Sequence, residues 1–218
     1  MDDETQQLVA MLAADLAGKV GERRHIVAIS GVPGSGKSYL SQQVCAALNA
    51  HAQVCAVLPM DGFHLSKRQL QQMPDAPEAL RRRGAHWTFD GAAFIATMRR
   101  VRDSEHEPVR APAFDHAVGD PVSDGIEIRP HHRIVLAEGL YAHVGAPPWG
   151  DIAGIADELW WVEPRDTGRA RQRLARRHLD ARLARTEAEA YERIATNDSL
   201  NGQYSEQNRL PPTRTIPN

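Results

Sequence analysis

Residues 31–38 read GVPGSGKS, a run of glycines that ends in a lysine and a hydroxyl side chain. The spacing matches G-x-x-x-x-G-K-[ST], and the run lies between an apolar stretch and a helical pattern, as this motif requires. In such a loop, successive backbone N–H groups and a helix N-terminus form a site for phosphate oxygens. The candidate nucleotide-binding residues are Gly31, Val32, Pro33, Gly34, Ser35, Gly36, Lys37, Ser38 and Tyr39.

Two side chains of this motif have specific expected tasks. Lys37 is expected to reach the β- and γ-phosphates, and Ser38 is expected to offer its hydroxyl to Mg²⁺. Glycines supply backbone conformations that side chains forbid and let a phosphate approach closely. The motif therefore predicts binding of a nucleoside triphosphate together with magnesium.

Asp61 follows the apolar run 53–58 and precedes Gly62, Phe63 and His64. If that run is a strand of a parallel sheet, its carboxyl end faces the same crevice as the glycine-rich loop. A carboxylate there could orient an acceptor hydroxyl and take its proton, with Phe63 as a wall of the pocket. Asp-Gly is also a common turn pair, so a local cap is the competing interpretation for Asp61. His64 could either contact substrate or form a local hydrogen bond.

A second acid, Glu138, comes at the end of the apolar stretch RIVLAEG at 133–139. An acidic residue after a buried strand commonly helps the glycine-rich loop to hold Mg²⁺, directly or through water. Ser38 and Glu138 are therefore the candidate metal ligands. An acid exposed at a strand end is the competing interpretation for Glu138.

Arginines recur along the helical pattern RARQRLARRHLDAR at 169–182. Arg169, Arg173 and either Arg176 or Arg177 share one helical face by their i, i+3/i+4 spacing. Because a guanidinium group is planar and always charged, it suits phosphate, and such a helix could close over the γ-phosphate as a lid. A solvated helix with surplus charge is the alternative.

These residues need a scaffold that brings them to one edge, and the apolar pattern predicts one. We expect strands at 25–30, 53–58, 133–139 and 158–163 and helices at 4–20, 37–49, 91–102, 166–184 and 186–197. Strands that alternate with helices predict a mainly parallel sheet with helices on both faces. Segment 71–90 is predicted mostly as loop, and 105–132 receives no firm assignment. Without a linker or repeat, we expect one domain over residues 1–218.

The composition sets further limits on function. The chain of 218 residues is 42% hydrophobic and 25% charged, as in ordinary globular proteins. Its net charge of −2 gives no reason to expect nucleic acid or an anionic membrane as partner. No apolar run approaches the ~20 residues of a membrane helix, and the acidic N-terminus does not resemble a signal peptide. Cys45 and Cys55 lack metal-ligand spacing, so we expect buried thiols in a reducing cytoplasm.

Glycine-rich phosphate loops occur in several classes of protein. The sequence has no N-K-x-D guanine-binding motif, which argues against a GTPase. It has no LSGGQ-like signature, which argues against an ABC subunit, and the chain is too short for most motors. A kinase must also orient and deprotonate an acceptor hydroxyl, and Asp61 could do so.

Seven short segments carry a family resemblance: GVPGSGKS, MDGFHLS, GAHWTFD, APAFDH, AEGLY, RLARRH and NDSLN. With them the chain resembles the P-loop kinase group of uridine kinase, phosphoribulokinase and bacterial pantothenate kinase. It is most similar to the bacterial branch labelled fructose-transport-system kinase or nucleoside/nucleotide kinase family. The segments keep the family order over roughly residues 25–201, which makes the resemblance specific. Tyr39 departs from the family, which usually has Thr there.

The resemblance implies a three-layer, doubly wound P-loop kinase core with a short helical lid at about 165–185. It implies ATP and Mg²⁺ as cofactors, and Lys37, Asp61, Arg173 and Arg177 as catalytic residues. Asp198 and Asn201 match a late D-x-x-N element that is expected near the adenine. The acceptor pocket of the family falls at Asp61, Phe63, His64, Arg83, Asp90, Phe114, Asp115, His116 and Tyr141.

The first interpretation is therefore an ATP-dependent kinase that phosphorylates a hydroxyl of a nucleoside, sugar or pantothenate-like metabolite. Arginines and histidines in the acceptor region would also suit an acceptor with a phosphate or carboxylate. The second is a regulatory protein that binds and slowly hydrolyses ATP without a small-molecule acceptor. A nucleic-acid-processing ATPase is disfavoured by the acidic net charge. The acceptor, the nucleotide base and the choice between monomer and homodimer stay open.

Overall fold

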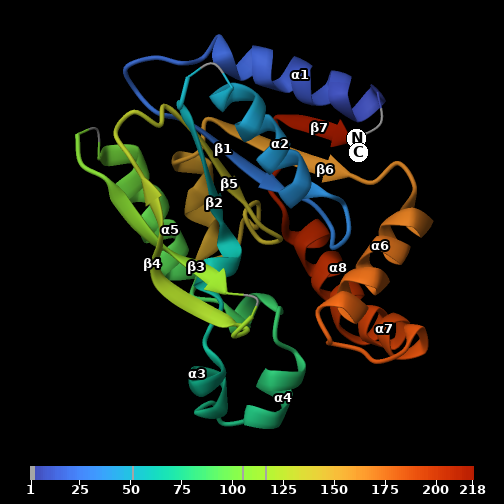
Figure 1. The fold of residues 1–218 in the computed structure, drawn as a ribbon. Coiled ribbons are helices and arrows are strands. Elements are labelled where there is room, and N and C mark those ends of the chain that lie inside the picture. The colour runs from blue at the N-terminus through green and yellow to red at the C-terminus, as the bar shows by residue number, and fades with distance from the viewer. Residues whose placement is uncertain (1–2, 51, 105, 116) are drawn as a thin grey trace.

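The computed structural model describes residues 3–50, 52–104, 106–115 and 117–218. A five-stranded parallel sheet lies at its centre, with strand order β2-β5-β1-β6-β7 (Figure 1). The strands are β1 (His25–Ser30), β2 (Cys55–Pro59), β5 (Ile134–Glu138), β6 (Glu158–Glu163) and β7 (Arg214–Pro217). The four strands expected from the apolar runs are present within one or two residues, and β7 is an additional strand at the edge.

The sequence of β5 is almost continuously apolar, and the position of this strand in the sheet explains why. It lies between β1 and β2, and all five of its residues are buried. A strand that is covered on both faces needs apolar side chains in both directions, so its run is continuous rather than alternating. Its last residue, Glu138, pairs with Ile29 of β1 and Pro59 of β2. The carboxyl ends of three strands therefore meet at Glu138.

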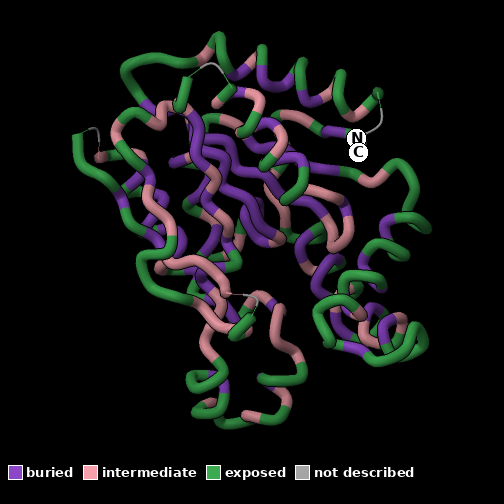
Figure 2. Tube along the Cα trace, viewed as in Figure 1, coloured by how far each residue is buried: buried purple, intermediate pink, exposed green. Residues whose placement is uncertain are grey.

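Helices cover both faces of the sheet and complete three layers (Figure 1). On one face, α1 (Asp3–Ala17) and α2 (Lys37–Asn49) pack their leucines and valines on the sheet. On the other face, α5 (Gly91–Asp103), the 3₁₀ segment η3 (Trp149–Gly154) and Tyr204 of α8 (Ser199–Asn208) form a second core. The burial pattern follows these layers, with buried residues concentrated along the strands (Figure 2). The predicted three-layer parallel α/β class is confirmed.

Two segments differ from the sequence-based expectation. Within 105–132 the chain forms an antiparallel hairpin of β3 (Val109–Asp115) and β4 (Asp120–Ile128). The segment predicted mostly as loop follows α3 (Lys67–Gln71) and contains α4 (Ala76–Arg81) and the 3₁₀ turn η2 (His86–Thr88). Ser66 and Gln69 form a capping box at α3, and Asp75 caps α4, so local caps start these short helices. The loop prediction was wrong in this part.

The region after β6 forms a helical unit beside the sheet (Figure 1). It consists of α6 (Thr167–Asp180), α7 (Glu187–Arg193) and a π-helical turn, η4 (Ile194–Asp198), which leads into α8. These elements share a small apolar cluster of their own, formed by Leu174, Ala175, Ala184, Ala190 and Ile194.

Two compositional expectations concern membranes and thiols. Among the described helices, none combines the length and apolar character that a bilayer crossing demands. Cys55 is buried and Cys45 is half-buried, and both are free thiols. Asn49 donates a hydrogen bond of 3.5 Å to the Cys45 sulfur and bonds both the N–H and C=O of Cys55 at 2.9 Å. Asn49 at the end of α2 therefore joins this helix to Cys55 at the start of β2, while its bond to Cys45 stays within α2.

Candidate active site

The glycine-rich loop joins β1 to α2. Glycine is required at its different positions for different physical reasons. Gly34 and Gly36 have φ angles of +81° and +88°, in the left-handed region that favours glycine. Gly31 has no room for a side chain, because a Cβ there would overlap the carbonyl oxygen of Val162. Gly36 precedes α2 without a side-chain cap, so the positive end of the helix faces the loop. The loop therefore has the backbone form of an anion site.

Ser38 and Glu138 meet next to this loop. The Ser38 hydroxyl donates a hydrogen bond of 3.0 Å to Oε2 of Glu138. Glu138 is buried, and this burial raises the pKa of its carboxyl to about 7, against the opposing effect of the Lys37 ammonium. Asp61 adds to the rise through its negative charge. A cation next to Glu138 would favour its ionised form.

Lys37 lies within the electrostatic range of several charged groups. Burial lowers the pKa of its ammonium, while the carboxylates of Glu138 and Asp61 act in the opposite direction. Arg177 lowers the pKa of both Lys37 and Glu138, so its positive charge also acts at this point. The predicted residues Lys37, Asp61, Glu138 and Arg177 are thus brought to one edge of the sheet.

Asp61 belongs to a 3₁₀ turn, η1 (Met60–Phe63), which begins directly after β2. Its side chain is exposed. Within the described chain this turn has no side-chain cap. The Asp61 carbonyl oxygen accepts a hydrogen bond from the His64 N–H at 3.2 Å and a second from Nδ1 of the His64 ring at 2.9 Å, so the local bond considered for His64 is present. The Asp61 carboxylate therefore does not cap the turn, and it lies at the edge of the sheet.

Two glycines allow close packing around Asp61. A Cβ at Gly62 would overlap the carbonyl oxygen of Pro112 in the hairpin, and a Cβ at Gly139 would overlap the side chain of Met60. Gly62 does not have a positive φ, so close approach of the hairpin, and not a special turn, is the reason for glycine there. The hairpin and the end of β5 together hold η1 in place.

Part of the predicted acceptor region forms an aromatic and basic group. The ring of His64 lies 3.9 Å from that of Phe89 and 5.0 Å from that of Phe114, measured between centroids. The guanidinium of Arg83 lies over Phe114, 5.6 Å from its centroid, and pairs with Asp120 at 2.5 Å. His64, Arg83 and Phe114 are therefore brought together where η1 meets the hairpin.

Three other residues predicted for this pocket have partners within the protein. Tyr141 is buried, and its hydroxyl donates a hydrogen bond of 2.7 Å to the carbonyl of Gly84. Asp90 caps α5 by accepting a bond of 2.8 Å from the N–H of Ala93. Phe63 is buried in the core. These contacts are structural, and substrate contact by these three residues stays a prediction.

The hairpin tip is fastened to the start of α3. The ammonium of Lys67 donates to the carbonyl of Val118 at 2.8 Å, and the N–H of Lys67 donates to the Asp120 carboxylate at 2.9 Å. The Asp115 carboxylate caps the turn of the hairpin. His116, predicted for the acceptor pocket, lies outside the described residues.

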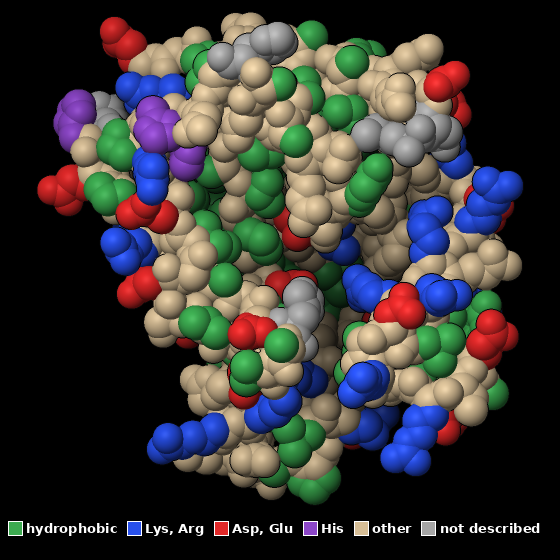
Figure 3. All heavy atoms as spheres, viewed as in Figure 1, with side chains coloured by type: hydrophobic (Ala, Val, Ile, Leu, Met, Phe, Trp, Pro, Cys, Tyr) green, Lys and Arg blue, Asp and Glu red, His purple; other side chains and the backbone are tan. Residues whose placement is uncertain are grey.

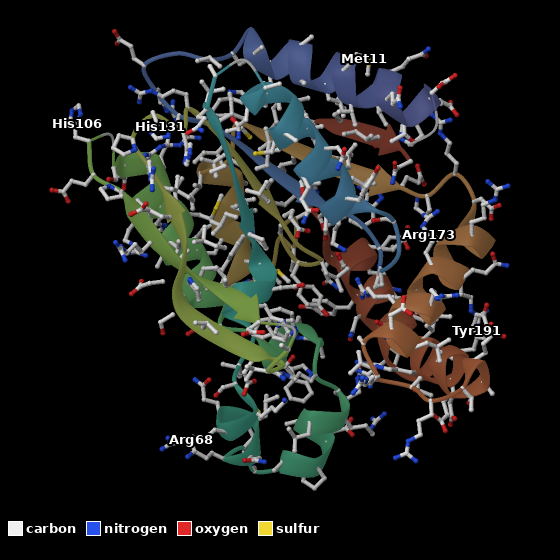
Figure 4. All side chains as sticks on the ribbon, in the orientation of Figure 1. Met11, Arg68, His106, His131, Arg173 and Tyr191 are labelled. Carbon is white, nitrogen blue, oxygen red and sulfur yellow. The ribbon has the colours of Figure 1, made fainter. Side chains whose placement is uncertain are left out.

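One arginine of α6 contacts the glycine-rich loop directly. Arg173, labelled in Figure 4, donates a hydrogen bond of 3.0 Å to the carbonyl of Gly34. Helix and loop are close, since a Cβ at Gly34 would lie 2.5 Å from the carbonyl oxygen of Ala170. Figure 3 shows a hollow between the hairpin side and the α6–α7 side, with Lys and Arg side chains gathered along the latter.

Asp198 and Asn201, predicted near the adenine, each form a hydrogen bond with a side chain of another element. A hydrogen bond of 2.9 Å joins Oδ2 of Asp198 to Nε2 of the buried His178. Asn201 is buried and accepts a bond of 2.9 Å from Arg82. Asp198 also acts electrostatically on Lys37. Both residues thus link other elements, and an adenine contact stays a prediction.

A cavity of about 360 Å³ lies on the other flank of the loop and was missed by sequence reasoning. We name it the flank cavity; its lining is Glu4, Thr5, Leu8, Gly36, Tyr39, Arg165, Asp166, Arg169, Arg173, Pro217 and Asn218. Tyr39 is 46% exposed, and Asn218 donates a hydrogen bond of 2.8 Å to the carbonyl of Ser35. Of these residues, the motif indicated Gly36 and Tyr39. No local signal could have linked Asn218 to the loop.

The parallel sheet, the glycine-rich loop and the charged groups at its edge define a nucleotide-binding protein of the P-loop kinase class. No protein-family model matches the chain. The Schizosaccharomyces pombe protein named "Putative uridine kinase C227.14" is 38% identical over 193 residues, which cover 88% of this chain and 82% of that protein. The "ATP-dependent kinase-like protein notR'" of Aspergillus versicolor is 41% identical over 161 residues, 72% of this chain and 93% of that protein.

A solved structure agrees with these relatives. A protein of Silicibacter sp. TM1040, described as a "putative fructose transport system kinase", superposes with a TM-score of 0.82 at 34% identity and covers 96% of this chain and 98% of that one. The chain therefore belongs to the family of ATP-dependent P-loop kinases that these relatives represent. The predicted resemblance is confirmed: the chain is a phosphotransferase that uses ATP and a small-molecule substrate.

Proposed function

We propose that this protein transfers the γ-phosphoryl group of ATP to a hydroxyl group of a small metabolite, such as a nucleoside, a sugar or a pantothenate-like alcohol. One observation carries the proposal. The carboxylate of Asp61 lies at the same sheet edge as Lys37 and Glu138 and acts electrostatically on both. A carboxylate at that point could orient an acceptor hydroxyl and take its proton, as a kinase requires. A protein that only hydrolysed ATP would use the same group on water, and the substrate screen below separates the two.

Magnesium is part of this proposal. Ser38 and Glu138 would hold it, because a hydroxyl and a carboxylate oxygen 3.0 Å apart are the hard oxygen donors that Mg²⁺ prefers. The buried Glu138, with a pKa of about 7, also fits, since an adjacent cation would favour its ionised form. When bound, magnesium would neutralise charge on the β- and γ-phosphate oxygens.

The donor site follows from the loop. Backbone N–H groups of residues 31–38 would bind the phosphates, and the Lys37 ammonium would contact the β- and γ-oxygens. Arg173 and Arg177 would stabilise charge on the transferred group. Arg173 already donates to the loop at Gly34, and the charge of Arg177 acts on Lys37 and Glu138. We propose residues 165–185 as a lid that closes over the γ-phosphate.

We assign the nucleoside part of ATP to the flank cavity. It borders the loop at Gly36 and offers the exposed ring of Tyr39 and the guanidinium group of Arg169, both of which stack well on a planar base. This proposal differs from the expected place near Asp198 and Asn201, whose side chains are bonded to His178 and Arg82.

The chemical step is an in-line displacement. The acceptor oxygen forms a bond to the γ-phosphorus while the bond from that phosphorus to the β,γ-bridging oxygen breaks, and ADP leaves. The hydroxyl proton passes to the carboxylate of Asp61, which acts as general base. His64, Arg83 and Phe114, grouped next to Asp61, would bind the rest of the acceptor.

A substrate screen tests this function. ATP consumption is followed with pools of small alcohols that include nucleosides, sugars and hydroxy acids, with the Lys37→Ala variant as background. We expect at least one pool to accelerate ATP consumption, with a product whose mass is increased by one phosphoryl group. Slow hydrolysis that no pool accelerates would instead support the regulatory ATP-binding alternative.

A further inference from the structure

The π-helical turn η4 connects two parts of the molecule through neighbouring residues. Asn197 accepts a hydrogen bond of 2.9 Å from Nε of Arg82 and donates one of 3.3 Å to the carbonyl of Arg83. The next residue, Asp198, is bonded to His178 of α6 at 2.9 Å. Single π-helical turns within helices are rare and frequently lie at functional sites. Here two successive side chains hold different segments of the chain.

The partners of Arg82 in this contact are buried polar groups. Its Nη2 donates to Asn201 at 2.9 Å, in addition to the bond from its Nε to Asn197. Both asparagines are buried. A buried amide that loses its hydrogen-bond partner is left desolvated and unpaired, which is costly in free energy. The bonds between the guanidinium and the two amides are therefore strongly favoured.

The connection continues from Arg83 to the hairpin. The guanidinium of Arg83 donates to the carbonyl of Leu65 at 2.9 Å and to the Asp120 carboxylate at 2.5 Å. It also lies over the ring of Phe114. Hydrogen bonds, together with the covalent links from Asp198 to Asn197 and within Arg83, thus connect α6 through η4 to the elements around His64.

We propose that Arg82 and Asn197 are positioning residues. They hold the elements around His64, where the acceptor would bind, in a fixed position relative to α6. This inference rests on the proposed function, in which α6 is part of the lid. Because Asn197 and Asp198 belong to one turn, a displacement of α6 on nucleotide binding is passed to Arg82 and Arg83 and then to the hairpin. Binding of nucleotide therefore orders the acceptor side before any acceptor is present.

Hydrogen exchange with a magnesium complex of a non-hydrolysable ATP analogue tests this without knowledge of the acceptor. In the wild type we expect exchange of residues 63–66 and 82–90 to slow by about fivefold or more, the lower end of common coupling between sites. In Arg82→Gln the loop at 31–38 should keep its protection by nucleotide, while the slowing at 63–66 and 82–90 disappears.

Arg81→Gln is the matched control. Arg81 is the preceding residue, it is exposed and it pairs with Glu78 within α4, so its loss should leave the wild-type response intact. Asn197→Ala removes the Arg82–Asn197 bond from the other side, together with the bond from Asn197 to the Arg83 carbonyl, and keeps the Arg82–Asn201 bond. It serves as the deciding variant if Arg82→Gln unfolds at a lower temperature. Arg82→Lys, which retains one donor group, should give an intermediate response.

Two results would overturn the inference: no slowing at 63–66 and 82–90 in the wild type, or the same slowing in Arg82→Gln, Asn197→Ala and Arg81→Gln. In either case protection of the loop at 31–38 would still support nucleotide binding and the proposed function. A wild type without protection at 31–38 would contradict the proposed function and this inference together.

Discussion

Ser38 and Glu138, 100 residues apart in the chain, are joined by a hydrogen bond of 3.0 Å between the hydroxyl and Oε2. The contact links the first turn of α2 to the last residue of β5. Around it lie the Lys37 ammonium and the Asp61 carboxylate, and burial raises the pKa of the Glu138 carboxyl to about 7. In the proposed magnesium site, a carboxylate with this pKa would make nucleotide binding sensitive to pH.

Binding of the magnesium–nucleotide complex should weaken below pH 7. Because the folded-state pKa of Glu138 is raised, the carboxyl is protonated below about pH 7 and cannot act as a metal ligand. Affinity should fall about tenfold for each pH unit below 7. Glu138→Gln should bind weakly and without this slope. Calorimetric titrations between about pH 5.5 and pH 8 measure it, and equal wild-type affinities at both ends would contradict the metal role.

The same shift predicts an effect on stability of the metal-free protein. A carboxyl group with a raised folded pKa binds more protons when folded, so its contribution is full below its unfolded pKa and is lost as pH rises through 7. The free energy of unfolding of the wild type, relative to Glu138→Gln, should therefore decrease from about pH 4.5 to pH 7. Urea denaturation of both proteins at several pH values measures this difference, and a constant difference would argue against it.

Lys37→Ala should weaken binding of the magnesium–ATP complex. The loss of a charge-assisted hydrogen bond costs roughly 1.5–3 kcal/mol, which corresponds to about 10- to 150-fold in affinity. Lys19→Ala is the matched control, because Lys19 is paired with Asp15 and Glu158 away from the loop. Affinities are measured by calorimetry, and identical values for Lys37→Ala and Lys19→Ala would remove Lys37 from the donor site.

Gly62→Ala should destabilise the fold around Asp61. The new methyl group would overlap the carbonyl of Pro112, so the hairpin must shift, and overpacking of this kind typically costs about 1–3 kcal/mol. Gly154→Ala is a suitable control, since no atom lies within 4 Å of a Cβ at Gly154. Urea denaturation of the two variants compares them. Equal stabilities would show that the hairpin does not press on η1.

The proposed lid should respond to nucleotide. Hydrogen exchange over 165–185 should slow when an ATP analogue binds, and Arg173→Ala should reduce that slowing because Arg173 bonds the loop at Gly34. Arg23→Ala, which removes an exposed arginine that faces Asp157, is the control for loss of charge. Equal exchange with and without the analogue in the wild type would contradict a lid.

Elements with strong local signals were predicted closely. Helix 37–49 and strand 158–163 have the expected bounds, because a motif starts the one and a continuous apolar run defines the other. The hairpin was missed since much of β4 is polar and exposed, and its strands are defined only by pairing with each other. Strand β7, four residues long, is likewise defined by its pairing with β6.

The site residues likewise divide into those with a local sequence signal and those defined only by long-range contacts. The glycine-rich loop, Asp61 and Glu138 could be found because strand ends at the carboxyl edge of a parallel sheet converge on one crevice. The contact of Asn218 with Ser35, and that of Arg82 with Asn197, join residues more than 100 positions apart. Neither Asn218 nor Arg82 belongs to a local pattern, so only the folded chain reveals these contacts.

Asp61→Asn addresses the central claim, that this carboxylate is the general base. The change keeps the size of the side chain and removes its basicity, so affinity for the magnesium–ATP complex should barely change. Loss of a general base typically costs ~10²–10⁴-fold in rate. In a loose phosphoryl-transfer transition state, part of that loss reflects positioning of the hydroxyl. Asp151→Asn, at an exposed aspartate that pairs with Arg99, is the matched control.

The decisive measurement is the rate of phosphoryl transfer by Asp61→Asn to an accepted alcohol at saturating ATP, together with the affinity for the magnesium–ATP complex. A rate reduced by ~10²–10⁴-fold, with near wild-type affinity, is the result that a general base predicts. A rate within about threefold of the wild type would contradict the account and leave Asp61 as a residue of the turn after β2.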